Sequence, residues 1–198
     1  MKIILGSSSA GRKLVMEELA QELGFDFEIM SPDIDEKAIR SDNPSDLVMA
    51  IANTKADALV SVIKEPAILI CSDQVVLYNG KIREKPINEI EAREFLQSYK
   101  SVHPETLGAV VVVNTKTGKR ASGLQTSKIY FKPLPKEIID KHIKSGMSLR
   151  GAGGFSIHDP ILKDYIDHIE GGFDSATGLS KELVKRLISQ VSDNIYNS

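Results

Sequence analysis

The sequence lacks several features that define whole classes of protein. Its 198 residues include a single cysteine, Cys71, so no disulfide can form within the chain. One thiol and four scattered histidines show no metal-ligand spacing, which argues against a structural zinc site. Cys71 ends the apolar run 67–70, and this position predicts a buried thiol in a reducing compartment.

An excess of one charge and long apolar runs are also missing. The 25 Lys and Arg nearly balance the 27 Asp and Glu, so no overall field attracts nucleic acid or acidic membranes. The first apolar run, 3–5, is too short for a signal peptide, and no run approaches the roughly 18 residues of a membrane span. We expect a cytoplasmic protein with no nucleic-acid or membrane partner, in which any anionic ligand is held locally.

Apolar runs alternate with helical patterns along the whole chain, which is typical of a mixed α/β protein. No linker or repeat divides the sequence, so residues 1–198 are expected to form one domain. Short apolar or alternating runs predict strands at 3–5, 67–71, 75–78, 109–113 and 127–131, with Ser72-Asp73-Gln74 as an interruption. Helical spacing and capping residues predict helices over 10–23, 44–63, 88–99, 135–143 and around 183–191.

The loop 6–9 and the helix after it carry the first unusual feature. Arg12 and Lys13 lie in the opening turn of the helix, where the helix dipole disfavours cations by about 0.3–1 kcal/mol each. A serine-rich loop between a strand and a helix is a common phosphate site. The alternative is that one serine is an ordinary helix cap and both cations point to water.

Lys55 lies on the apolar stripe of the second predicted helix, four residues from both Ile51 and Leu59. One interpretation is a side chain that reaches solvent at the edge of the helix. The other is that the ammonium pairs with a ligand phosphate or with a carboxylate.

Carboxylates form the third feature. Asp73 follows a buried strand, where an unpaired charge is costly to desolvate. Glu36 lies in an acidic segment that also holds Asp33 and Asp35, for which a solvated turn or a helix cap is the simpler interpretation. Such groups either hold a hard divalent cation or act as a base.

Lys85 precedes Pro86, which fixes the backbone direction beside the lysine. Together with Arg12 and Lys55 it supplies cations, while Asp73 and Glu36 supply oxygen ligands for a metal. This combination suits a polyphosphate substrate.

In combination and in order, these segments resemble the Maf (septum formation) family of nucleoside triphosphate pyrophosphatases over essentially the whole chain. The segments that carry the resemblance are 4–13, 33–36, Lys55-Ala56, 72–76, Lys85-Pro86 and 152–155. The resemblance implies an inosine-triphosphatase-like α/β fold, with a mixed twisted sheet, flanking helices and two lobes around a cleft. It also implies cleavage of a nucleoside triphosphate to a monophosphate and pyrophosphate, assisted by Mg²⁺ or Mn²⁺.

The resemblance also assigns roles to individual residues. It places Asp73, Lys55 and Lys85 in catalysis; Ser9, Arg12 and Gln74 in substrate binding; and Glu36 with Asp73 at the metal. Gln74 matches a Ser-Asp-Gln subgroup associated with pyrimidine or methylated nucleotides. No role is carried over from 176–180, where Ala-Thr-Gly-Leu-Ser replaces the usual Val-Val-Gly-Leu-Pro.

Two rival functions use the same residues. One is a nucleotide-binding regulator of cell division with little turnover, and the other is a phosphatase that removes a terminal phosphate from a small metabolite. The first product distinguishes the two enzymes: a nucleoside triphosphate pyrophosphatase releases pyrophosphate, and a phosphatase releases inorganic phosphate. Base identity, the choice between magnesium and manganese, a homodimer, and the roles of His158 and Asp159 are left open.

Overall fold

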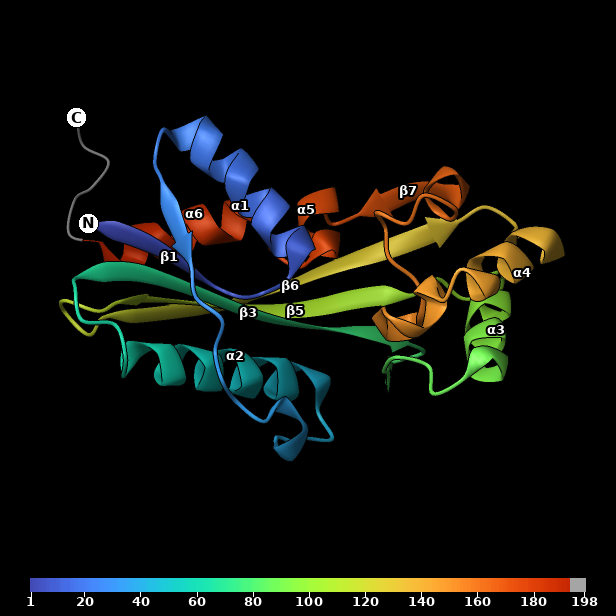
Figure 1. The fold of residues 1–198 in the computed structure, drawn as a ribbon, viewed down its shortest axis with the longest axis horizontal. Coiled ribbons are helices and arrows are strands. Elements are labelled where there is room, and N and C mark those ends of the chain that lie inside the picture. The colour runs from blue at the N-terminus through green and yellow to red at the C-terminus, as the bar shows by residue number, and fades with distance from the viewer. Residues whose placement is uncertain (193–198) are drawn as a thin grey trace. The chain divides into compact units, whose positions relative to one another are not determined.

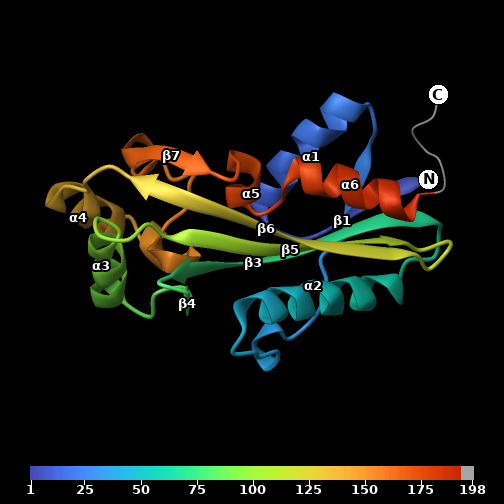
Figure 2. The ribbon, with the colours of Figure 1, turned by 180° about the vertical axis from the view of Figure 1, so that it is seen from behind.

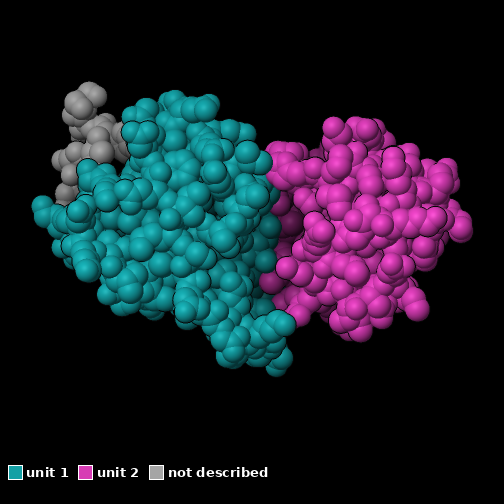
Figure 3. All heavy atoms as spheres, viewed as in Figure 1, with its two compact units in different colours: residues 1–74, 108–125, 177–198 teal, residues 75–107, 126–176 magenta. Residues whose placement is uncertain are grey.

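The computed structural model describes residues 1–192 and shows the mixed α/β fold that the sequence predicts. Contacts divide the chain into two compact units (Figure 3). Unit 1 comprises residues 1–74, 108–125 and the chain from 177 onward, and unit 2 comprises residues 75–107 and 126–176. A single domain with two lobes around a cleft stays a prediction. No helix among the described residues has the length and apolar composition needed to cross a bilayer.

Seven strands within the described residues form one mixed sheet, in the order β2-β1-β3-β5-β6-β7 with β4 paired to β3. Strand β1 is parallel to both neighbours, whereas β3 with β4 and β6 with β7 are antiparallel. The strands are β1 (Lys2–Gly6), β2 (Phe27–Ile29), β3 (Ala67–Tyr78), β4 (Lys81–Arg83), β5 (Glu105–Asn114), β6 (Arg120–Phe131) and β7 (Ile166–Glu170).

In unit 1, helices cover both faces of the sheet (Figures 1 and 2). Helices α1 (Ala10–Leu23) and α6 (Lys181–Val191) lie on one face, and α2 (Pro44–Val60) lies on the other. The main core joins apolar side chains of α1 and α6 to those of β1, β3 and β5. Because both faces are covered, residues 67–73 are all buried, which explains the continuous apolar run at the start of β3.

Unit 2 is built around Tyr99, which is fully buried and stacks on Phe131 with ring centroids 5.7 Å apart. The Tyr99 hydroxyl donates to the carbonyl of Gly153 at 2.6 Å, so this buried polar atom is satisfied. The helices of this unit are α3 (Glu89–Ser98), α4 (Lys136–Lys144) and α5 (Phe173–Thr177), whose last residue belongs to unit 1. Short 3₁₀ turns are η1 (Glu36–Ala38) in unit 1 and η2 (Met147–Leu149), η3 (Ala152–Gly154) and η4 (Lys163–Tyr165) in unit 2.

Local signals placed most elements correctly, and the differences have physical causes. The prediction that residues 72–74 interrupt the sheet is wrong, because β3 continues through them as one strand of 12 residues. The predicted strand 127–131 is likewise only the last part of a longer strand, β6, which begins at Arg120. Helix α2 ends at Val60 rather than near Ile63. Strands β2 and β7 and helix α5 were not predicted, because they are short and carry few buried residues.

Candidate functional site

The connection from β1 to α1 forms a loop whose hydroxyls are already organised. Ser9 is the helix cap, and its Oγ accepts from the backbone N–H of Arg12 at 3.5 Å. The Oγ of Ser7 accepts from the N–H of Ser9 at 3.2 Å and from Nη1 of Arg12 at 3.3 Å. Lys13 is exposed and pairs with Glu17 one turn later. The cap interpretation therefore holds for Ser9, but only Lys13, not Arg12, points to water.

Arg12 is held in place by a residue far away in the chain. Its Nε donates to the carbonyl of Gly178 at 3.2 Å, and the hydroxyl of Ser72 donates to the same carbonyl at 2.9 Å. Desolvation lowers the pKa of Arg12 from its ordinary value, and the nearby carboxylates of Asp73 and Glu36 act in the opposite direction. Within residues 1–192 its Nη2 has no hydrogen-bond partner, so this donor is available to an anion.

Lys55, Asp73 and Glu36 meet in unit 1 from three separate segments. The Nζ of Lys55 lies 2.8 Å from Oδ1 of Asp73 and 3.0 Å from Oε1 of Glu36. The side chains of Lys55 and Asp73 are 6% and 9% exposed, whereas Glu36 is 52% exposed. Of the two interpretations of Lys55, pairing with a carboxylate is confirmed, and the side chain does not reach solvent. Oδ2 of Asp73 makes no hydrogen bond among the described residues.

The donor set can be tested against a divalent cation. Within residues 1–192 no cluster of three or more acidic, histidine or cysteine side chains could hold a metal alone. Asp73 and Glu36 converge on one ammonium, and each has a second oxygen beside it. Magnesium is commonly held by one or two carboxylates together with substrate phosphates and water. The two carboxylates therefore fit a metal that arrives with the substrate, rather than a permanent protein cage.

Other predicted site residues are placed as follows. Gln74 ends the first segment of unit 1, directly after Asp73, and its Oε1 lies near Gly178. Lys85 belongs to unit 2, follows β4 and is exposed, while the adjoining Pro86 is buried. The structure brings Ser9, Arg12, Glu36, Lys55, Asp73 and Gln74 together in unit 1. The catalytic and binding roles of all these residues, and of Lys85, stay predictions.

Sequence reasoning missed three residues of this arrangement, Ser7, Ser72 and Gly178. Gly178 has a φ of 117°, a conformation that L side chains rarely adopt, and a Cβ there would lie 3.1 Å from Nε of Arg12. The glycine in 176–180 was the available signal, although a sequence alone does not tell which glycine needs a positive φ. Cys71 is buried and free as predicted, and burial raises the pKa of its thiol to about 12.

Comparison with known proteins identifies the family. The model of the family described as Maf-like protein matches residues 2–191. A 7-methyl-GTP pyrophosphatase of Dictyostelium discoideum is 45% identical over 197 residues, covering 96% of this chain and 97% of that protein. A dTTP/UTP pyrophosphatase of Bdellovibrio bacteriovorus is 32% identical over 192 residues, covering 95% and 97%. Among solved structures, a HAM1 protein from Coxiella burnetii aligns over 96% of this chain and 98% of that chain, with a TM-score of 0.44 and 15% identity.

The chain thus belongs to the Maf family, and the family predicted from its segments is confirmed. The predicted enzyme class, a nucleoside triphosphate pyrophosphatase acting on acid anhydrides, is confirmed by the same relatives.

Proposed function

We propose that this protein hydrolyses a modified or pyrimidine nucleoside triphosphate to the monophosphate and pyrophosphate, with a divalent metal, as a house-cleaning enzyme. The buried pair of Lys55 and Asp73, with the half-exposed Glu36 and with Arg12 beside them, carries the proposal. It combines fixed cations with an Asp73 oxygen that has no hydrogen-bond partner within residues 1–192. Cytoplasmic location and a homodimer belong to the same proposal.

The charges of the side chains in this cluster favour the binding of a metal together with the triphosphate. Arg12 and Lys55 carry two positive charges and Glu36 and Asp73 two negative ones, so the described cluster is formally neutral. A triphosphate brings several negative charges, which this cluster alone does not neutralise. Mg²⁺ or Mn²⁺ held by Glu36 and Asp73 would neutralise charge on the phosphates, and Lys85 would add a further cation.

The side chains divide the chemistry between positioning and proton transfer. Arg12 binds phosphate oxygens through its available Nη2, with Ser9 and Gln74 beside it, and Lys55 neutralises charge next to Asp73. Asp73 accepts a proton from a water molecule, through the carboxylate oxygen that does not hold the metal, as the water oxygen bonds to the α-phosphorus. The bond from that phosphorus to the bridging oxygen breaks, and pyrophosphate leaves with the electron pair. Positioning and charge neutralisation supply most of the rate, and the base contributes about 10²–10⁴-fold.

The named substrates of the relatives suggest which nucleobase the substrate carries. 7-Methyl-GTP is the first candidate because the relative named for it is 45% identical, against 32% for the relative named for dTTP and UTP. Guanine, uracil and thymine all carry a carbonyl group on the ring, whereas adenine has none. We therefore extend the proposal to bases with a ring carbonyl.

Pyrophosphate release from 7-methyl-GTP, UTP, dTTP and ATP with Mg²⁺ or Mn²⁺ tests the function. Asp73→Asn keeps the shape of the side chain and is expected to lower turnover at least about 100-fold. The matched control is Asp35→Asn, because Asp35 is an exposed cap of η1 and asparagine caps equally well. Undiminished turnover in Asp73→Asn rejects the role of this residue. Triphosphate that stays bound and intact for hours supports the nucleotide-binding regulator instead.

A further inference from the structure

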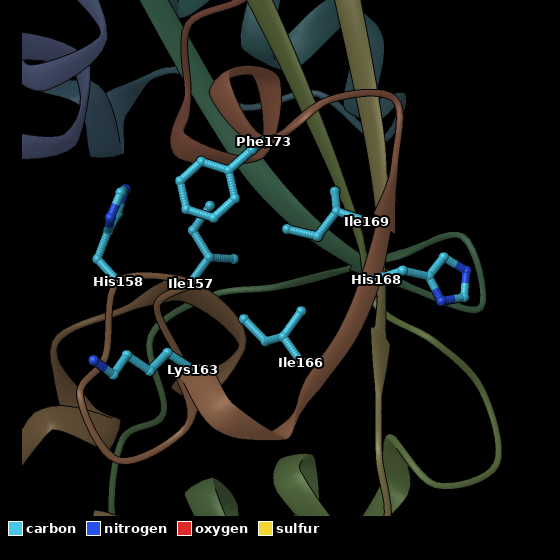
Figure 4. Close-up of a pocket in the computed structure, with 7 residues that line it drawn as sticks. All are labelled: Ile157, His158, Lys163, Ile166, His168, Ile169 and Phe173. Atoms are coloured by element: carbon cyan, nitrogen blue, oxygen red, sulfur yellow. The ribbon is translucent and has the colours of Figure 1, made fainter.

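Unit 2 contains a pocket of its own (Figure 4), with a volume of about 510 Å³. Its wall consists of the apolar side chains of Ile157, Ile166, Ile169 and Phe173. Two basic groups, His158 and Lys163, lie at one side of it in Figure 4. Pockets for small ligands commonly measure about 300–1,000 Å³ and combine an apolar lining with a few polar groups. The size and lining therefore fit a small organic ligand.

The apolar part of the pocket presents an aromatic surface. Phe173 is 54% exposed, and its ring lies near Ile157 and Ile169 in Figure 4. The rings of His158 and Phe173 meet edge to face, with centroids 5.2 Å apart and an interplanar angle of 86°. A large exposed aromatic ring beside aliphatic side chains offers a platform on which a flat ring can stack.

The polar part of the pocket favours a hydrogen-bond acceptor. The Lys163 ammonium can only donate, and its side chain has no hydrogen-bond or ion-pair partner within residues 1–192. His168 also borders the pocket, but Figure 4 shows its ring directed away from the other side chains, and it stacks on Tyr130 at 4.1 Å. A carbonyl oxygen at the edge of a ring can accept from Lys163, whereas an exocyclic amino group, which donates, cannot.

Asp159 fixes the turn that carries both basic groups. Its Oδ1 accepts from the N–H groups of Ile161 at 2.7 Å and Leu162 at 3.1 Å. Its Oδ2 lies 3.0 Å from Nδ1 of His142, and both side chains are buried. The backbone N–H of Lys163 donates to the carbonyl of Asp159 at 2.9 Å. The pocket is therefore preorganised, which lowers the entropy lost when a ligand binds.

We infer that this pocket binds a nucleobase that carries a ring carbonyl, with the base stacked on Phe173 and the carbonyl accepting from Lys163. The inference rests on the proposed function, since a nucleotide substrate supplies such a base. Within this pocket, Lys163 favours guanine, uracil or thymine over adenine.

Methyl NMR of the full chain, with ¹³C-labelled isoleucine δ1 methyls, tests the inference. Uridine, 7-methylguanosine and adenosine are added to about 10 mM without metal, a range that detects dissociation constants near 1 mM. Uridine and 7-methylguanosine should shift the methyls of Ile157, Ile166 and Ile169 and leave those of Ile4 and Ile90 in place. Adenosine should bind at least about threefold more weakly, because its base offers Lys163 only ring nitrogens and no carbonyl oxygen.

Variants separate the two contacts. Phe173→Ala should weaken the binding of every nucleoside about tenfold or more. Phe173→Tyr keeps an aromatic ring and should bind with the affinity of the unchanged protein. Lys163→Met should remove the preference over adenosine, whereas Lys81→Met, at an exposed lysine of β4, should not. The inference is overturned if none of the three pocket methyls shifts, or if adenosine binds the unchanged protein as tightly as uridine.

The binding experiment tests the pocket separately from the proposed function, because it contains no triphosphate and no metal. Uridine binding in the pocket of a protein that releases no pyrophosphate would reject the proposed function alone. Pyrophosphate release by a protein whose pocket methyls stay unmoved would reject this inference alone.

Discussion

Replacing Lys55 by methionine removes the ammonium that neutralises Asp73 and keeps most of the volume of the side chain. Asp73 is 9% exposed, and Oδ1 lies 2.8 Å from the lysine nitrogen, so the variant leaves a buried carboxylate without its ion-pair partner. Breaking a buried pair in this way costs about 3–5 kcal/mol. Glu36 is 52% exposed and regains solvation by turning to water, so its loss adds little.

Urea denaturation measures the effect. Because a whole domain is stable by about 5–15 kcal/mol, the variant should still fold, with a midpoint roughly 1–2 M lower and an unchanged slope. The double variant Lys55→Met/Asp73→Leu removes both charges and should recover at least about half of the lost free energy. That recovery would show that the cost comes from the unpaired carboxylate.

Lys13→Met is the matched control. Lys13 is exposed and pairs with Glu17 at 3.6 Å, so its replacement should change the free energy of unfolding by less than about 0.5 kcal/mol. If Lys55→Met destabilises the protein no more than Lys13→Met does, the buried pair contributes nothing and the reasoning is refuted.

Three further outcomes are expected. Because burial raises the pKa of the Cys71 thiol from its ordinary 9.0 to about 12 in the folded protein, the unfolded chain loses this proton first as pH rises. The free energy of unfolding should therefore decrease between pH 9.0 and about pH 12, by up to about 1.4 kcal/mol per pH unit. Urea titrations at several alkaline pH values should show a smaller decrease for Cys71→Ala. Gly178→Ala should lower stability by about 1–3 kcal/mol and raise KM for the triphosphate by displacing Arg12. Gly118→Ala, at a positive φ with nothing within 4 Å, should lower stability but leave KM unchanged, and an equal rise in KM for both variants would contradict the role of Gly178. Chelation with EDTA should abolish pyrophosphate release reversibly yet leave the melting temperature nearly unchanged, because Lys55 and Arg12 already balance the charges of Asp73 and Glu36. Activity that persists after chelation would reject the metal.

Elements with strong local signals were predictable from the sequence. Helix α1 begins after the capping residue Ser9 and ends at Gly24, whose φ of 71° suits glycine. Lys55 was recognisable because a charge on an apolar stripe violates the helical pattern. The short edge strands β2 and β7 gave no comparable signal, since neither contains a residue that is fully buried.

The residues 72–74 show why a polar segment misleads. A carboxylate in an apolar run suggests a break, but Asp73 remains within β3 because an ion pair with Lys55 offsets its desolvation. The partner lies 18 residues earlier, on a helix, and strand patterns carry no information about it.

The sequence by itself determined the family, the mixed α/β class, and which cations and carboxylates break local rules. Only the tertiary structure decided that Lys55, Asp73 and Glu36 meet at one nitrogen, and that the carbonyl of Gly178 holds Arg12 from 166 positions away. Caps and periodicity act over a few neighbouring residues, so they are written in the local sequence. Contacts between distant segments depend on how the sheet and helices pack, and that packing is a property of the whole folded chain.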